Sequence, residues 1–249
     1  MKNCQYEVPI ESAQHLVRSN ALRQRFQRIR SKQADYGPNP PNLESIEIPM
    51  ELTKTYDAEP FLYADSGLAD PNRVIIFATP TNIQFLKAHA TWFGDGTFAV
   101  SPSLFYQLYT INIITKGKNL PLIYALLPDK QQNTYSKMYV MLLKSFTENE
   151  FPKSFTHDFE KGALNSIVEN FTGINIFGCY FHFAQNLWKQ MQQKKLSLSY
   201  INNKEIRFHY KLLKALCFVP PPDVINAFNL ISKTAPASFI PMLTYLETY

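Results

Sequence analysis

The order of apolar segments in the middle of the chain limits the possible folds more than any other feature. Three consecutive runs rich in β-branched and aromatic residues occupy 92–100, 105–115 and 119–127, with short polar turns between them. Such runs are typical of antiparallel strands joined by hairpins. The apolar spacing then alternates, which predicts helices at 133–146, 163–171 and 182–195 and strands at 153–157 and 174–177. The sequence therefore predicts an α/β domain with a mixed sheet, in which three antiparallel strands precede alternating helices and strands.

Charge and proline divide the chain into segments. Lys and Arg outnumber Asp and Glu by seven to two in residues 1–34, whereas the ratio is one to eight in residues 35–70 and 17 to ten in residues 71–249. A strand at 74–77 and a helix at 80–88 open the compact body. We predict a basic helical arm and Pro-rich linker at 1–41, an acidic extended segment at 42–72, a core at 73–198 and a truncated all-helical region at 199–249.

The basic arm has the spacing of an amphipathic helix between residues 12 and 34, because apolar residues recur there with a helical period. Two interpretations stay open: the basic side chains contact DNA phosphates, or they are only solvated. The side chains that would contact DNA are Arg18, Arg23, Arg25, Arg28, Arg30 and Lys32.

Cysteine spacing and hydropathy exclude several classes of protein. The three cysteines, Cys4, Cys179 and Cys217, are far apart and odd in number, so neither a disulfide framework nor a four-ligand zinc site is predicted. No apolar run approaches the roughly 20 residues of a membrane span, and the N-terminus has no secretory signal. We expect an intracellular protein without a membrane partner.

Asp95 is a charged residue inside an otherwise uncharged, aromatic-rich run, Thr91–Phe98. A buried carboxylate without a partner is costly, so this position suggests a bound cation or a neutralising side chain. Gly94 and Gly96, on either side, would leave room for a metal or a phosphate near the backbone. The alternative is a plain Asp-Gly turn.

Asp158 follows at the end of the predicted strand 153–157 and the start of a helix. Taken alone, it could be a helix N-cap. Together with Asp95 it suggests catalysis, because carboxylates from separate strands hold the metal ions of two-metal phosphoryl-transfer sites. Hard oxygen ligands favour Mg²⁺ or Mn²⁺. Asp95 and Asp158 are therefore the candidate catalytic and metal-binding residues.

A Cys-x-x-His sequence, from Cys179 to His182, leads from the predicted strand 174–177 into the next helix. No second pair at zinc-finger spacing accompanies it, so zinc is disfavoured. The simpler alternative is a buried cysteine beside a helix-capping histidine. Gln185 and Lys189 lie on the polar face of the same predicted helix and are further candidates for DNA contact.

Three motifs in this order resemble the transposase domain of Mutator-like elements, the MULE family: Gly94-Asp95-Gly96-Thr97-Phe98, His157-Asp158-Phe159-Glu160 and Cys179-x-x-His182-x-x-Gln185. The resemblance covers residues 40–249 and implies a DDE recombinase with a ribonuclease-H-like core, in agreement with the predicted order of elements. It also implies that Asp95 and Asp158 are the first two metal-binding acids and that Cys179 and His182 form the family's C(2)H motif. Mg²⁺ or Mn²⁺ as cofactor, DNA as partner, no small-molecule substrate and a nuclear location follow from it as expectations.

The third acid of the family has no counterpart in this pattern. In the family a Glu within an Asn-x-x-Glu segment follows a helical insertion, and residues 199–249 contain no such segment. Glu205 and Glu247 are the only glutamates after Glu169. We therefore predict a transposase-derived, DNA-binding and catalytically incomplete protein; the alternative is a fragment of an active transposase that cleaves and joins DNA strands. We also expect the region after Ser199 to pack loosely and to expose Leu212, Leu213, Leu216 and Phe218.

Overall fold

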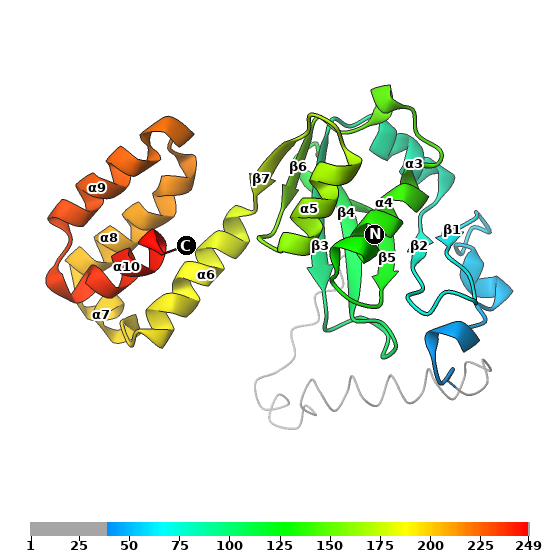
Figure 1. Ribbon diagram of the computed structural model, residues 1–249, viewed down its shortest axis with the longest axis horizontal. Helices are drawn as coiled ribbons and strands as arrows, with labels where there is room; N and C mark the ends of the chain where they lie inside the picture. The colour runs from blue at the N-terminus through cyan, green and yellow to red at the C-terminus, as the bar shows by residue number, and fades with distance from the viewer. Residues whose placement is uncertain (1–38, 249) are drawn as a thin grey trace, which may run out of the picture. The chain divides into compact units, whose positions relative to one another are not determined.

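A seven-stranded mixed sheet forms the centre of the computed structural model, which describes residues 39–248 (Figure 1). The strands lie in the order β1-β2-β5-β4-β3-β6-β7. Their bounds are β1 Leu62–Asp65, β2 Ile75–Phe77, β3 Thr91–Thr97, β4 Gln107–Thr115, β5 Lys118–Leu127, β6 Ser154–His157 and β7 Asn175–Gly178. The predicted α/β class is confirmed.

The meander of β3, β4 and β5 is antiparallel, as the three apolar runs predict. Lys116 and Gly117 form the hairpin between β4 and β5, and both have positive φ angles, of 50° and 71°. A two-residue turn with this handedness matches the twist of the flanking strands. β6 then pairs with β3 in parallel, and β7 pairs with β6 in parallel.

The β1 edge of the sheet differs from the sequence prediction. β1 comes from the acidic segment 42–72, which we expected to be extended and outside the compact body, yet it pairs antiparallel with β2. Arg73 explains the difference, because its guanidinium donates hydrogen bonds to Asp65 at the end of β1 and to the carbonyls of Leu43 and Ile46. This long-range contact joins the segment to the sheet.

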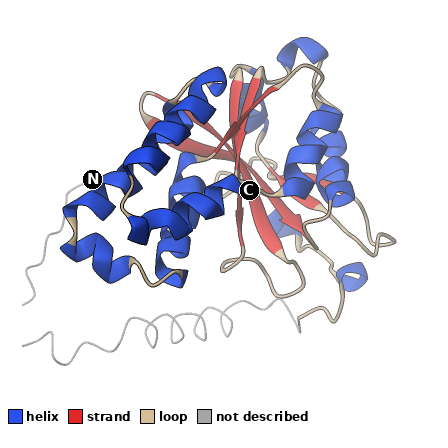
Figure 2. Ribbon diagram, turned by 60° about the vertical axis from the view of Figure 1, so that its left-hand side comes forward, coloured by secondary structure: helices blue, strands red, loops and turns tan. Residues whose placement is uncertain are grey.

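Helices α4 (Gln132–Leu143) and α5 (Lys161–Asn170) lie side by side on one face of the sheet (Figures 1 and 2). α4 begins at Gln132, one residue before the predicted helix 133–146, because Gln131 is extended and its carbonyl accepts hydrogen bonds from the Thr134 and Tyr135 amides. α3 (Pro80–Lys87) is capped by Thr79 and packs near β5. These helices and the sheet enclose an aromatic core that includes Trp92, Tyr109, Tyr139, Phe155 and Phe171.

Five α-helices follow β7 in the described part of the chain: α6 Tyr180–Gln193, α7 Ser197–Asn202, α8 Lys204–Ala215, α9 Val224–Thr234 and α10 Ile240–Glu247. They share a second apolar cluster in which Leu213 and Leu216 are buried and Leu212 is partly buried. The expectation that these leucines are exposed is therefore wrong, since α9 and α10 cover them with residues such as Ile231 and Met242. Phe218 is 72% exposed, as expected. Among residues 39–248, no helix has the length and apolar character needed to cross a bilayer.

Candidate functional site

The register of the parallel strands brings Asp95 and Asp158 to the same level of the sheet. In the β3–β6 pair, Phe93 lies opposite Thr156. Two residues further along each strand, this register places Asp95 level with Asp158, which directly follows β6. Because successive side chains alternate between faces, the two positions also share a face. The structure therefore brings both sequence-predicted acids to one end of two neighbouring strands.

The same level continues onto β7 and the start of α6. His157 lies opposite Gly178 in the β6–β7 pair, so the next residue, Cys179, is level with Asp158. α6 begins directly after Cys179 and carries His182 in its first turn. The Nε2 atom of His182 lies 3.8 Å from Oδ1 of Asp95. Both residues of the Cys-x-x-His motif thus lie at the carboxylate site, a position that their spacing alone does not predict.

Asp158 has a histidine partner of its own. The Nδ1 atom of His157 lies 2.6 Å from Oδ1 of Asp158. The His157 side chain is only 1% exposed, and its ring stacks on Tyr109 with 5.6 Å between centroids. The backbone amide of Glu160 donates a second hydrogen bond to the same carboxylate oxygen. Asp158 is therefore held in place from two sides.

Electrostatics keep Asp158 ionised. Burial alone would raise the pKa of Asp158, but the hydrogen bond and the charge of His157 outweigh it, with smaller contributions from the Glu160 amide and from His182. The resulting pKa lies below the ordinary value of an aspartate. The site therefore presents an anionic carboxylate at neutral pH.

The two glycines beside Asp95 serve a purpose other than the predicted one. A Cβ atom at Gly94 would overlap Tyr109 Oη and lie 2.7 Å from His157 and 2.8 Å from Phe155; at Gly96 it would overlap the amide oxygen of Gln107. The space beside both glycines is thus filled by buried side chains. The expectation that they leave room for a metal or a phosphate is wrong, because they face the packed side of the sheet, opposite to Asp95.

A polar network behind the carboxylates was not predicted from the sequence. Gln107 donates to the hydroxyl of Tyr135, and that hydroxyl donates to Glu160. Tyr109 and Tyr139 share a further buried hydrogen bond. The burial of His157, which lies beside this network, could have been predicted from the sequence, since strand alternation puts His157 on the same face as the buried Phe155. The hydrogen bonds of the network join residues from strands and helices that are far apart in the sequence, so the sequence pattern does not predict them.

Unsatisfied polar atoms gather at this end of the sheet. Across residues 39–248, the buried side-chain polar atoms without a hydrogen-bond partner belong to Gln107, His157, Glu160 and His182. Buried polar groups are normally hydrogen-bonded, so such a cluster is unusual. This end of the sheet therefore has buried polar atoms whose hydrogen bonds are not made by the protein itself.

The remaining predicted residues have separate positions. Gln185 and Lys189 are exposed on α6, one and two turns after Phe181. The arm residues Arg18, Arg23, Arg25, Arg28, Arg30 and Lys32 lie outside the described residues.

Glu205 is in the first turn of α8 and Glu247 is the last residue of α10. Within residues 39–248, no three Asp, Glu, His or Cys side chains are grouped so that they could hold a metal ion.

A known family matches the part of the chain that carries the candidate site. Residues 91–186 match the family model described as the MULE transposase domain. This range includes Asp95, Asp158, Cys179 and His182, and it extends from β3 into α6. A search of curated proteins finds no match. Residues 91–186 of the chain are therefore similar to the MULE transposase domain.

Proposed function

We propose that this transposase-derived protein binds DNA, with the phosphate backbone at the end of β3 and β6, and does not complete strand cleavage and transfer. The observation that carries the proposal is the common level of Asp95 and Asp158 on neighbouring parallel strands, inside the segment that matches the transposase domain. A ribonuclease-H-like arrangement of the core is part of the same proposal. It is supported by the antiparallel meander followed by the parallel strands β6 and β7.

The residues present fit one Mg²⁺ or Mn²⁺ ion. Two carboxylates supply hard oxygen ligands, and both are accessible, with Asp95 51% and Asp158 23% exposed. Cys179 and His182 add no further hard oxygen. A divalent ion held there would act as a Lewis acid on a phosphodiester oxygen. The chain's own contribution is to orient Asp158 through His157 and to keep it ionised.

Catalytic incompleteness is proposed because the described residues supply two acids and not three. A second metal ion of a two-metal site needs further carboxylate ligands to fix its position. Misplacing a reacting group by about 1 Å can reduce the rate by about 10²-fold. We therefore expect no strand transfer and at most trace nicking by the 249-residue chain.

The alternative function is that of an active DDE transposase of which this sequence is a part. It is favoured by the presence of the first two acids in register. Metal-dependent cleavage of DNA by the purified chain, abolished in both Asp95→Asn and Asp158→Asn, would establish the alternative and reject catalytic incompleteness. Glu205→Gln and Glu247→Gln would then show whether either glutamate supplies the third acid.

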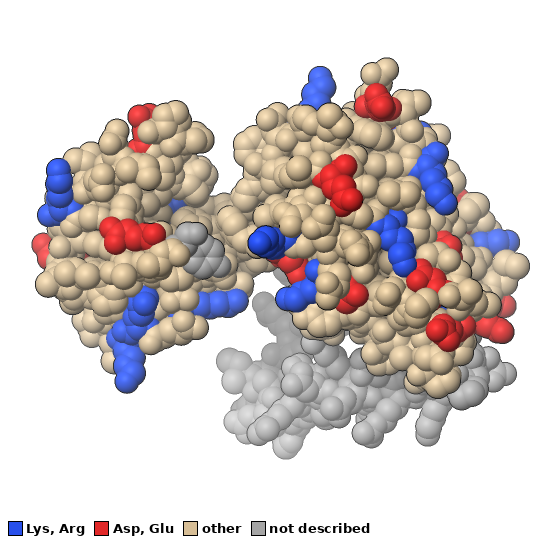
Figure 3. Space-filling model, viewed as in Figure 1, with Lys and Arg blue, Asp and Glu red and all other residues tan. Residues whose placement is uncertain are grey.

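DNA affinity is assigned mainly to the basic arm and to α6. On the face of the described residues seen in Figure 3, acidic and basic side chains are interspersed, with no large patch of one sign. Phosphate contacts dominate the affinity of proteins for DNA and make it depend on salt. We therefore propose that the six arm residues and Lys189 contact phosphates. A nuclear location is proposed because of the DNA partner alone.

Salt titration of duplex binding tests this proposal. Fluorescence anisotropy would compare the full chain with a chain beginning at Asn42, using duplexes of two unrelated sequences. We expect the shorter chain to bind more weakly to both duplexes, and its log–log salt slope to fall by about one for each lost phosphate contact. No DNA binding by the full chain would reject the proposed function. Equal slopes would instead confine DNA contact to residues 42–249.

A further inference from the structure

Two exposed aromatic rings lie at the same end of the sheet as the carboxylates. Phe98 and Tyr106 are 51% and 48% exposed, and their ring centroids are 5.3 Å apart in an edge-to-face arrangement. They stand at the two ends of the connection between β3 and β4. The neighbouring Phe105 is buried, and the Tyr106 amide bonds to the carbonyl of Leu127. The pair is therefore exposed although its backbone is anchored.

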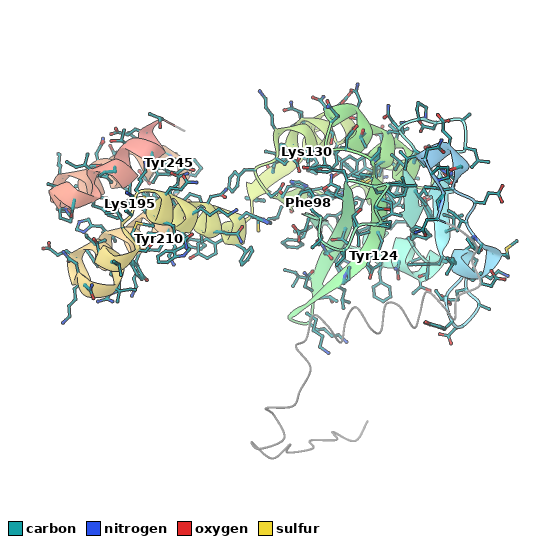
Figure 4. The ribbon with its side chains drawn as sticks, turned by 90° about the horizontal axis from the view of Figure 1, so that it is seen from below. Phe98, Tyr124, Lys130, Lys195, Tyr210 and Tyr245 are labelled. Atoms are coloured by element: carbon teal, nitrogen blue, oxygen red, sulfur yellow. The ribbon has the colours of Figure 1, made fainter. Side chains whose placement is uncertain are left out.

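A lysine accompanies the aromatic pair. The Nζ atom of Lys130 lies 5.9 Å from the Tyr106 ring centroid and 3.7 Å from Oε1 of Glu160. Glu160 is itself fixed, because its other oxygen accepts a hydrogen bond from Tyr135. Figure 4 shows Phe98 and Lys130 in the sheet-containing part of the molecule. A positive charge is thus held beside the exposed Tyr106 ring, which itself packs against Phe98.

The aromatic pair and the carboxylates are connected through short stretches of chain. Phe98 is three residues after Asp95, a separation of at most about 11 Å along an extended chain. On the other side, the amide of Glu160, the partner of Lys130, donates to the Asp158 carboxylate. A nucleotide whose phosphate lies at the two carboxylates therefore has the aromatic pair within reach of a neighbouring base.

We propose that Phe98, Tyr106 and Lys130 form a stacking site for one unpaired nucleobase of the bound DNA. Exposed aromatic rings beside a positive charge are the chemistry that binds single-stranded nucleic acid, since any base can stack on them while the cation contacts the adjacent phosphate. A base inside a duplex has no free face, so the site selects DNA with an unpaired or frayed end. This inference rests on the proposed function and names its substrate class.

Competition between blunt and overhanging DNA tests the stacking site. Two duplexes of the same paired sequence would be used, one blunt and one with a short single-stranded overhang carrying 2-aminopurine. We expect the overhang to bind about 5- to 150-fold more tightly, as stacking of one base allows, and the 2-aminopurine fluorescence to be quenched on binding. Phe98→Ala should remove both effects and leave blunt-duplex affinity unchanged, whereas Phe98→Trp should retain them.

Phe85→Ala is the matched control. Phe85 is also a phenylalanine with a half-exposed ring, 48% exposed, but it lies on α3. Its substitution should leave the overhang preference intact. Lys130→Ala should lower the salt slope for the overhang by about 0.7, the value for one phosphate contact on a single strand.

The outcomes distinguish the stacking site from the proposed function. DNA binding with equal affinity for both duplexes overturns the stacking site alone, and so does an equal loss in Phe98→Ala and Phe85→Ala. Absence of DNA binding overturns the proposed function and the stacking site together. Circular dichroism and the thermal midpoint of each variant would show that the half-exposed ring was removed without unfolding the chain.

Discussion

Asp65 and Asp158 lie at the ends of two strands of the same sheet, yet their surroundings are opposite. Asp65 ends β1 and accepts two hydrogen bonds from the guanidinium of Arg73, from Nε to Oδ1 at 2.8 Å and from Nη2 to Oδ2 at 2.5 Å. Asp158 follows β6 and has an imidazole as its partner. A guanidinium is always charged, whereas an imidazole is charged only when protonated. The first carboxylate is permanently neutralised, and the second is not.

This difference separates a structural carboxylate from one that is available to a ligand. Arg73 is 4% exposed and also joins residues 43 and 46 to the sheet, so its pair with Asp65 closes the β1 edge. At the β3–β6 end, the one side-chain ion-pair partner of Asp95 among residues 39–248 is His182, whose Nε2 atom lies 3.8 Å from Oδ1 of Asp95. Proteins retain such incompletely satisfied polar groups where function needs them. This difference supports the proposed site at the β3–β6 end.

Breaking the structural pair should have the largest effect. Arg73→Leu leaves the Asp65 carboxylate without a cation and removes two hydrogen bonds to backbone carbonyls, so we expect a loss of about 3–5 kcal/mol in unfolding free energy. Urea denaturation at neutral pH measures it. Asp95→Asn is the control at the other end and should change stability by less than about 1 kcal/mol. Equal losses of unfolding free energy in Arg73→Leu and Asp95→Asn would contradict the distinction between a structural carboxylate at Asp65 and an available one at Asp95.

Acid should weaken the structural pair in a defined direction. Burial alone would raise the pKa of Asp65, but hydrogen bonds from Arg73 and from the Gly67 amide lower it below the ordinary value. Its contribution to stability is therefore present above the unfolded pKa, about 3.9, and is lost as pH falls through the folded pKa. Asp65→Asn should destabilise the protein at pH 7, and the difference from the native protein should shrink below about pH 4. A difference that is constant between these pH values would contradict the account.

Filling the space beside Asp95 should have an intermediate effect. Gly94→Ala would force a methyl group against Tyr109, His157 and Phe155, and overpacking of this kind costs about 1–3 kcal/mol. Thermal or chemical unfolding measures the loss. Tyr109→Phe removes the nearest atom, so the double variant should lose less than the sum of the two single losses. Strict additivity would show that Gly94 does not accommodate Tyr109.

The smallest expected effect concerns the partner of Asp158. His157→Gln removes the hydrogen bond and the charge that lower the pKa of Asp158, so that pKa should rise. Carbon-detected NMR titration of the Asp158 carboxyl measures the change directly. The pKa of Asp65 in the same spectra serves as an internal reference and should not move. An unchanged pKa of Asp158 would show that His157 does not hold this carboxylate.

Local patterns account for what the sequence predicts well. The strand runs and the Lys116-Gly117 turn are local signals, so β3 to β5 are found close to the expected positions. Strand order predicts that Asp95 and Asp158 lie at the same end of the sheet, and the β3–β6 register, extended by two residues, places them at one level. β1 escapes prediction because it has four residues, all half-buried, and depends on Arg73 eight residues after its last residue.

Contacts between distant segments account for what is missed. The glycines beside Asp95 are explained by Tyr109 and His157, which come from other strands. The burial of Leu213 depends on Ile231 and Met242 in later helices. Amphipathic spacing identifies a buried face, but it cannot tell which element covers it. DNA binding by Gln185 and Lys189, and by the basic arm, stays a prediction.

Mn²⁺ binding by the two aspartates tests the central claim most directly. Electron paramagnetic resonance of free Mn²⁺ would be recorded during titration of the native chain, Asp95→Asn, Asp158→Asn and the double variant, with Asp65→Asn as a control carboxylate outside the site. We predict one weak site that either substitution at the β3–β6 end abolishes, with no further loss in the double variant, and that Asp65→Asn retains. Undiminished binding in the double variant, or two sites each lost through only one substitution, would contradict a shared site at Asp95 and Asp158.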